Sequence, residues 1–282
     1  MAKPPEKARQ RDSRAARIEA RLKRCLRQWK HGLVGWKWFQ GDYLTWADAR
    51  AAAGGYDDPK IVERVLTATL AVRNGEAAFE RDSVLFYEPA DDEPLLAALK
   101  KASAQNRDRL RVLDFGGSLG TVYWRHRAWL KTVTDHWDIV EQPGFVAAGR
   151  QHFSDTPLRF FPSVETAEGC SDHDVLLCST ALQYLPDPHA VLDRWKAFQG
   201  RFLLFNNLPL HRKKPDRLRI QHIPPEIYTA TYPCWFFNRD RFLEHFSKTH
   251  EVLAEFASEA VWPVGFGSYP STGLLLGRME VR

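Results

Sequence analysis

The sequence has few cysteines, and no pattern that would use them. Its four cysteines are Cys25, Cys170, Cys178 and Cys234, and they form neither a CxxC pair nor a zinc-binding spacing. We therefore expect no disulfide framework and a reducing, cytoplasmic compartment. The chain also lacks any apolar run near the length of about 18 residues that spans a membrane. It shows no signal peptide either, so we expect neither a transmembrane helix nor a cleaved leader.

Negative charge is scarce at the N-terminus. The net charge of the 282-residue chain is +5, but residues 1–40 hold 12 Lys and Arg against Glu6, Asp12 and Glu19, which leaves −4 for the remainder. Because the basic character belongs to this arm, the composition argues against a nucleic-acid groove on the main domain and predicts no nucleic-acid partner.

The arm, residues 1–35, divides into two parts. Residues 1–13 are polar and charged, which predicts disorder. Further on, Ile18, Leu22 and Trp29 recur at helical spacing among arginines and predict a basic amphipathic helix. Such a helix could contact the anionic inner face of a membrane. Packing of its apolar side chains on its own domain is the alternative, and we favour it.

Beyond the arm, apolar runs alternate with helical periodicity. We expect strands at 111–115, 138–141, 158–161, 174–178, 201–205, 251–256 and 272–277, with helices at 120–131, 143–153, 188–199 and 239–247. This alternation predicts an α/β domain over residues 105–282, with a parallel sheet and helices on both faces. Three helices, at 46–53, from Asp57 to Asn74 and at 93–104, predict a helical cap over residues 36–104.

A glycine turn organises the main domain. Val112-Leu113 suit a buried strand, and the pattern Asp114-x-Gly116-Gly117-Ser118-x-Gly120 leads into a helix. Glycines let the backbone approach a ligand, and a helix N-terminus offers free N–H groups. About twenty residues later a second strand ends at Glu141, where an acid would hold a ribose diol. A turn that serves only close helix–strand packing is the alternative.

These motifs resemble class I S-adenosylmethionine-dependent methyltransferases, although Ser118 stands where a middle glycine is usual. The segment Leu182-Gln-Tyr-Leu-Pro-Asp-Pro188, after the predicted fourth strand, is similar to the same family. The resemblance implies a Rossmann-like, seven-stranded sheet and S-adenosyl-L-methionine as cofactor. The run Leu113-Asp-Phe-Gly-Gly-Ser-Leu-Gly-Thr121 and fragments from Gly41 onward further resemble a poorly characterised bacterial methyltransferase group, many of whose members are linked to surface polysaccharides or secondary metabolites.

The family pattern implies cofactor contacts residue by residue. The methionine part would lie at Asp114 and at the turn formed by Gly116, Gly117, Ser118 and Gly120, and Glu141 would take the ribose hydroxyls with Gln142 beside it. Ser179 and Gln183 would face the junction of cofactor and substrate; capping of the next helix is their alternative role. Pro162-Ser163 could border the adenine or form a plain loop.

The stretch from Asn206 to Phe237 is predicted to build the substrate pocket. His222, held between Gln221 and a pair of prolines, is our candidate general base, although a lone histidine is more often structural. Arg217 and Arg219 could clamp a phosphate or carboxylate, or lie on a solvated loop. The full set of candidate substrate residues is Arg81, Arg217, Arg219, Gln221, Tyr228 and Tyr232. Arg81 belongs to the charged run 80–83, which could be a surface salt-bridge cluster or a lid over the cofactor.

We predict a metal-independent enzyme. Asp172-His173-Asp174 could suggest a metal site, but the trio begins an apolar strand, and ligands of such sheets bind at the opposite, C-terminal strand ends. The predicted activity is methyl transfer to a sugar hydroxyl of a surface polysaccharide or of its lipid- or nucleotide-linked precursor. The alternatives are N- or O-methylation of a small secondary metabolite, and a non-catalytic scaffold that binds the cofactor.

Overall fold

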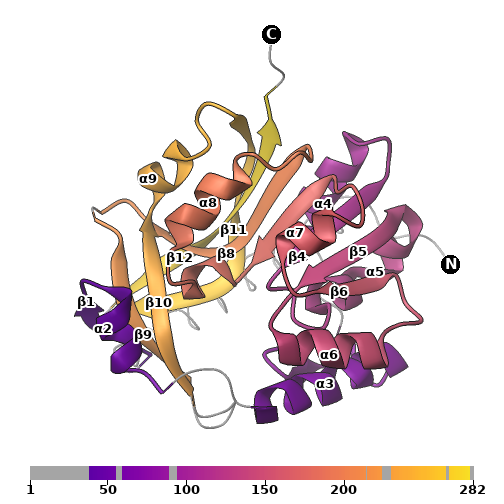
Figure 1. Ribbon diagram of the computed structural model, residues 1–282, viewed down its shortest axis with the longest axis horizontal. Coiled ribbons are helices and arrows are strands. Elements are labelled where there is room, and N and C mark those ends of the chain that lie inside the picture. The colour runs from indigo at the N-terminus through magenta and orange to yellow at the C-terminus, as the bar shows by residue number, and fades with distance from the viewer. Residues whose placement is uncertain are drawn as a thin grey trace, which may run out of the picture.

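The computed structural model describes residues 38–54, 59–88, 94–213, 215–223, 230–264 and 267–279 (Figure 1). The predicted basic arm with its amphipathic helix, and Tyr228, lie outside these residues. Within them, no helix combines the length and the apolar character that a membrane crossing needs.

A central sheet carries the architecture. Its strands are β4 (Leu110–Phe115), β5 (Thr134–Val140), β6 (Leu158–Phe161), β7 (Val175–Ser179), β8 (Phe202–His211), β11 (His250–Val264) and β12 (Gly267–Arg278). They lie in the order β6-β5-β4-β7-β8-β12-β11. The first five pair in parallel, and β12 runs antiparallel to both β8 and β11. The order and the reversed last strand confirm the Rossmann-like, seven-stranded α/β sheet expected from the sequence.

Helices cover both faces of this sheet. On one face lie α3 (Pro59–Asn74), α4 (Pro94–Ala104), α5 (Thr121–Val133) and α6 (Pro143–His152); on the other lie α7 (Val164–Glu168), α8 (Pro188–Trp195) and α9 (Arg239–Glu244) (Figure 1). Strand alternation supplies both cores. Val112 packs with the first set of helices and its neighbour Leu113 with the second, because successive side chains of a strand point to opposite faces.

Additional strands extend the sheet beyond β8. They are β1 (Phe39–Tyr43), β9 (Arg217–Ile223) and β10 (Ala230–Asn238), which we call the β extension. β1 pairs antiparallel with β9 and β9 with β10, while β10 joins β8 in parallel only at Phe237 and Asn238. No strand was predicted from the sequence within 206–237, where β9 and β10 lie, and the alternative of a solvated loop at Arg217 and Arg219 was wrong. Pro233 is tolerated within β10 because that part of the strand pairs on one side only.

The predicted cap region, residues 36–104, contains strands as well as helices. The short helix α2 (Trp46–Ala51) packs on β9 and β10. A hairpin of β2 (Phe79–Arg81) and β3 (Val84–Phe86) packs against α5. Its two turn residues, Asp82 and Ser83, both have positive φ angles, 52° and 63°, as a tight hairpin turn requires. The N-terminal region thus packs on the β extension through α2 and on α5 through the hairpin.

Candidate functional site

The glycine turn lies between the C-terminal end of β4 and the start of α5. Gly116, Ser118 and Gly120 all adopt left-handed backbone conformations, with φ of 71°, 57° and 91°. Ser118 thus takes the conformation that a glycine would adopt most easily. Gly120 is the N-cap of α5 and offers no side-chain cap, so the first N–H groups of that helix stay available near the turn.

Asp114 lies directly beneath the turn. Its side chain is fully buried, and Oδ2 accepts a hydrogen bond of 2.9 Å from Trp137 Nε1. A Cβ atom placed on Gly117 would lie 2.4 Å from the same oxygen. Oδ1 is buried without a hydrogen-bond partner. Burial raises the pKa of Asp114 to about 7; the Trp137 hydrogen bond opposes this shift and the charge of Glu141 adds to it.

Glu141 follows β5 and connects two loops. Its carboxylate accepts hydrogen bonds from the backbone N–H groups of Ser118, at 3.2 Å, and Gln142, at 2.8 Å. Burial raises its pKa, and these two bonds oppose the shift. Because Gly116 N also donates to Val140 O, at 2.9 Å, the end of β5 fixes the path of the glycine turn. The sequence-predicted acid therefore lies next to the sequence-predicted turn.

The loop after β7 closes against the same turn. A Cβ atom on Gly116 would lie 2.3 Å from that of Ala181. Ala181 precedes the 3-10 turn η2 (Leu182–Tyr184), in which Gln183 is fully buried and neither atom of its amide has a partner. The next helix, α8, is capped by Asp187 instead, through Ala190 N at 3.0 Å. The helix-capping alternative for Ser179 and Gln183 was therefore wrong.

Two strained residues at this rim were not predicted. Thr180, directly after β7, and Asn207, within β8, have φ angles of 61° and 56°. A β-branched residue rarely adopts this conformation, and such strain clusters at functional sites. Asn207 Nδ2 donates to Thr180 Oγ1 at 3.1 Å, and Asn206 Nδ2 donates to Ser179 Oγ at 3.0 Å. The available sequence signal was the pair Asn206-Asn207 directly after the predicted strand 201–205.

Gln221 and Tyr232 meet η2 from the β extension. They are directly opposite each other in β9 and β10. Tyr184 donates its hydroxyl to Gln221 Oε1 at 2.8 Å, and its ring packs edge-on to that of Tyr232 with centroids 5.0 Å apart. Two of the predicted substrate residues therefore lie beside the residue that follows Gln183.

His222 lies on the other face of β9. Its neighbour Gln221 faces Tyr184, so strand alternation directs the imidazole of His222 the opposite way. The residue opposite it, Thr231, accepts a hydrogen bond of 2.6 Å from Gly54 N, on the side of α2. The general-base role of His222 stays a prediction that this geometry does not favour.

The three candidate arginines differ in their surroundings. Arg217 forms an ion pair with Asp42. Arg219 makes one long hydrogen bond, of 3.4 Å, from Nη1 to Phe39 O. Arg81 lies in β2, with its guanidinium 5.4 Å from the ring centre of Phe86. Of the two arginines in β9, the strand that contains Gln221, Arg219 has the weaker described contact.

The 80–83 hairpin is anchored by a buried carboxylate. Glu80 is 3% exposed and accepts hydrogen bonds from Thr121 Oγ1 and Ser83 N. Burial raises its pKa. The interpretation of this run as a surface salt-bridge cluster was therefore wrong at Glu80. Because Thr121 is the first residue of α5, the hairpin adjoins the glycine turn, as a lid would.

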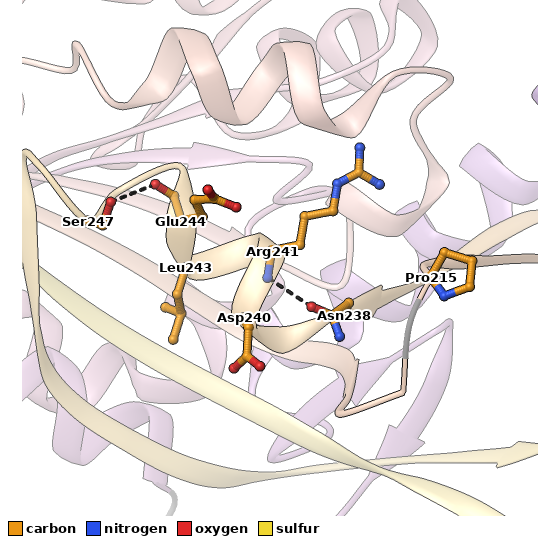
Figure 2. A pocket seen from close by; sticks show the side chains of 7 residues that line it. All are labelled: Pro215, Asn238, Asp240, Arg241, Leu243, Glu244 and Ser247. Carbon is orange, nitrogen blue, oxygen red and sulfur yellow. Dashed lines mark hydrogen bonds between the residues drawn. The ribbon is translucent and has the colours of Figure 1, made fainter.

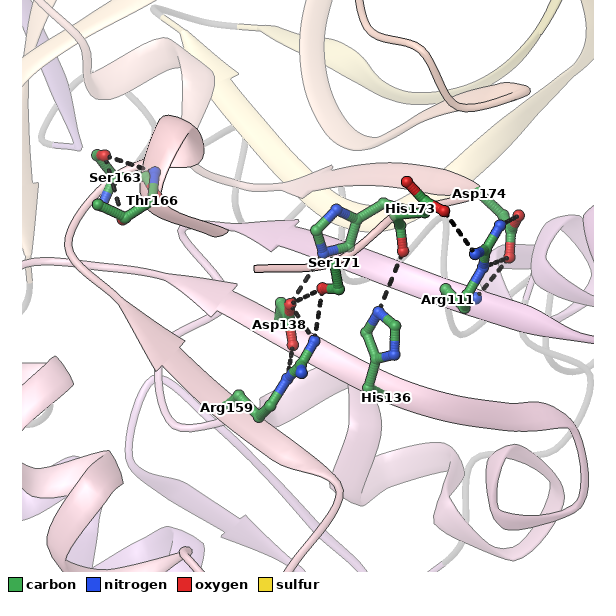
Figure 3. A network of polar contacts seen from close by, with 10 residues as sticks. Arg111, His136, Asp138, Arg159, Ser163, Thr166, Ser171, His173 and Asp174 are labelled. Atoms are coloured by element: carbon green, nitrogen blue, oxygen red, sulfur yellow. Dashed lines mark hydrogen bonds and ion pairs between the residues drawn. The ribbon is translucent and has the colours of Figure 1, made fainter. Parts of the chain in front are cut away.

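A histidine–carboxylate network at the opposite strand ends offers metal-ligand atoms. Atoms of His136, Asp138 and His173 lie within 4.8 Å of one another (Figure 3). Asp138 is fully buried, and its two oxygens accept 2.6 Å hydrogen bonds from Arg159 Nε and Nη2. It also contacts His173 Nε2 at 2.9 Å and Ser171 Oγ at 3.0 Å. Because a guanidinium already neutralises this carboxylate and would repel a metal cation, the network is better suited to joining β5, β6 and β7 than to holding a metal.

Of two cavities in the described part of the chain, one lies away from the glycine turn and the other borders it through Phe115 and Val140. One, of about 720 Å³, is lined by α9 and its flanks: Pro215, Asn238, Asp240, Arg241, Leu243, Glu244 and Ser247 (Figure 2). The other, of about 530 Å³, lies on the α7–α8 side, where Phe115, Val140 and Ser163 contribute to its wall. Pro162 and Ser163 both line this second cavity, at the C-terminal ends of the strands. Ser163 also caps α7 through Thr166 N, so its described contacts are those of a helix-capping loop.

Comparisons with known proteins give similarity of structure alone. No family model and no curated protein matches the chain. Among solved structures, it is similar to a glycopeptide N-methyltransferase, MtfA, in complex with S-adenosylmethionine, with 11% identity, a TM-score of 0.44, and coverage of 67% of this chain and 95% of that one. It is also similar to a Burkholderia thailandensis 1,6-didemethyltoxoflavin-N1-methyltransferase with bound S-adenosylhomocysteine, with 16% identity, a TM-score of 0.42, and coverage of 80% and 93%. A third is an S-adenosylmethionine-dependent methyltransferase from Clostridium acetobutylicum, with 9% identity, a TM-score of 0.43, and coverage of 64% and 89%. At these scores the fold rests on the strand order described above.

Proposed function

We propose that this chain is an S-adenosyl-L-methionine-dependent methyltransferase. The observation that carries the proposal is the buried Asp114 carboxyl, which has an oxygen without a partner directly under a left-handed glycine turn. A buried acceptor without a donor is costly, and the ammonium group of a methionine moiety would satisfy it. The buried, unpartnered amide of Gln183 adds a second polar group to the same rim.

The chain's own residues would hold the cofactor in parts. Asp114 would accept hydrogen bonds from its amine, and Glu141, whose carboxylate oxygens can each accept more than one bond, would take the ribose hydroxyls. The turn backbone would line the space between them. When bound, the cofactor supplies an electrophilic methyl group on a sulfonium. The protein then has to align the acceptor and exclude water, which can contribute about 7–11 kcal/mol to lowering the barrier.

For the acceptor we propose a hydroxyl of a sugar, in a surface polysaccharide or in its lipid- or nucleotide-linked precursor. The support is the sequence resemblance, together with the rings of Tyr184 and Tyr232 and the amide of Gln221 beside Gln183. Aromatic faces and amides suit the apolar and hydroxyl faces of a sugar. A hydroxyl acceptor also benefits from a general base, which contributes a rate factor of about 10²–10⁴.

The proposal is tested in two steps. Calorimetry with S-adenosylhomocysteine measures cofactor binding, and methyl turnover with pooled sugar nucleotides measures activity. Binding with turnover supports the enzyme, and binding without turnover of any sugar or small-metabolite acceptor favours a non-catalytic scaffold. Absence of S-adenosylhomocysteine binding to the folded protein would overturn the proposal. An interaction of the basic arm with anionic membrane is tested separately, by sedimentation with anionic and neutral vesicles.

A further inference from the structure

A third, small core lies between the β extension and the β11–β12 hairpin. It is formed by Phe39, Cys234, Phe236 and Trp262, with Tyr184 and Tyr269 packed against it. Arg219 is directly opposite Cys234 in the antiparallel pair of β9 and β10. Opposite residues of such a pair project to the same face, so Arg219 projects to the face of β9 that packs on this aromatic core, and its Nη1 reaches Phe39 O.

Arg219 is poorly satisfied there. A guanidinium has five N–H donors, yet the contact found for Arg219 is the 3.4 Å bond from Nη1 to Phe39 O. Its Nε atom is buried without a partner, and among the described residues no carboxylate forms an ion pair with it. Burial lowers its pKa, and the charge of Arg217 adds to that effect. Trp262 brings a second buried N–H, on Nε1, that also lacks a partner.

Two other arginines of the sheet have carboxylate partners. Arg217, two residues away on the same face of β9, pairs with Asp42. Arg159 donates two hydrogen bonds of 2.6 Å to the carboxylate of Asp138. Withdrawing a cation from water without a counter-charge costs free energy, unless a ligand supplies that counter-charge. Arg219 is therefore a half-buried cation without an ion-pair partner among the described residues, although the charge of Asp42 acts on it without forming an ion pair.

We infer that Arg219 binds an anionic group of the methyl acceptor, a carboxylate or a phosphate, with the indole N–H of Trp262 as a second donor. This inference rests on the proposed function. Arg219 is two residues from Gln221 on the same face of β9, about 7 Å along a strand. Gln221 contacts Tyr184, which follows Gln183 at the rim. An acceptor that bears an acidic group could thus bind Arg219 while its reacting end lies near Gln183.

The experiment measures binding of three small probes to the full chain, without cofactor, by calorimetry and by thermal unfolding. Phenyl phosphate and benzoate carry the two acidic groups on a ring, and benzyl alcohol is the neutral control. We expect at least one anion to bind and to raise the Tm, and benzyl alcohol to do neither. The stronger of the two anions identifies the acidic group. Arg219→Gln should weaken anion binding by about tenfold or more, because charge-assisted bonds are lost.

Arg239→Gln is the control, since it removes a partly buried arginine of α9 that already pairs with Glu255; it should retain the anion affinity of the wild type within about threefold. If Arg219→Gln does not fold, Arg219→Lys keeps the charge but loses the Nε donor and the planar fork, and should still weaken binding. Equal anion binding by wild type and the Arg219 variants, or no anion binding by wild type, would overturn the inference. Binding of S-adenosylhomocysteine, measured on the same variants, reports separately on the proposed function.

Discussion

Trp137 donates its indole N–H to Asp114 across two neighbouring parallel strands, at 2.9 Å, and both side chains are fully buried. The bond fixes one carboxyl oxygen and leaves the other without a partner beneath the glycine turn. This arrangement favours ligand binding at the expense of stability, because desolvation disfavours the charged form of the acid.

The first prediction concerns the pH dependence of stability. The pKa of Asp114 is about 7 in the folded chain and about 3.9 when unfolded. Between these values the folded state binds the extra proton, so this residue makes stability fall as pH rises from about 4 to 7. Asp114→Asn should remove that contribution. Urea unfolding should show that the free energy of unfolding of the variant, relative to that of the wild type, is higher at pH 8 than at pH 5. Calorimetry should show weaker cofactor binding by the variant. An identical stability difference at both pH values would contradict this.

Glu141→Ala should weaken S-adenosylhomocysteine binding by about tenfold or more, since a lost hydrogen bond to a charged group is worth about 1.5–3 kcal/mol. Glu141→Gln keeps the shape but gives up two acceptor positions, so an intermediate loss is expected. Calorimetry measures both affinities, and circular dichroism checks the fold. Unchanged affinity in Glu141→Ala would remove the ribose assignment.

Gly117→Ala should abolish cofactor binding, because its Cβ atom would lie 2.4 Å from the Asp114 carboxylate and would displace either the turn or the acid. Gly144→Ala, at the start of α6, meets its nearest neighbour at 3.4 Å and serves as the control. We expect near-normal binding by the control in a fluorescence titration with S-adenosylhomocysteine. Normal binding by Gly117→Ala would show that the turn does not approach the ligand.

Two arginine substitutions should have opposite effects on stability. Arg159→Met leaves the fully buried Asp138 without its counter-ion, and should cost about 3 kcal/mol, the lower end for a broken buried pair because Arg159 is itself partly exposed. Arg219→Met removes a cation without an ion pair and should be neutral or stabilising. Chemical denaturation of both variants tests the contrast. A large loss of stability in Arg219→Met would indicate that its charge is already compensated in the free protein.

Metal chelation should leave activity unchanged, because Arg159 already occupies the carboxylate of the His136, Asp138 and His173 group. Dialysis against a chelator, followed by the methyl-transfer assay, measures this directly. Thermal unfolding with added zinc provides the complement, with His136→Ala as control. A zinc-dependent rise in Tm that disappears in His136→Ala would establish a metal site there.

Local patterns predicted the parts of the site that depend on neighbouring residues. The apolar run, the glycine turn and Glu141 lie within one βαβ unit, so their spacing reports their geometry directly. The β extension was missed because β1 and β9 pair Phe39 with Gln221, a contact that no local pattern contains. Pro233 also disfavours a strand assignment from sequence alone, although it lies in a strand with pairing on one side. The face of β9 on which His222 lies could be assigned only once the strand was known.

The pairing of β1 with β9 also constrains the order in which the chain can fold. The sheet strands β4 to β7 are contiguous in sequence and can associate early. Phe39 can pair only after Gln221 has been synthesised, and the aromatic core around Phe236 can form only after Trp262 has been synthesised. Since contacts between distant positions form slowly, strands β4 to β7 can pair before the β extension is assembled. Premature chain termination before β11 would leave Leu204 and Phe205 of β8 without Leu275 and Leu274, the residues of β12 that pair with them, so both cores of the central sheet would stay incomplete.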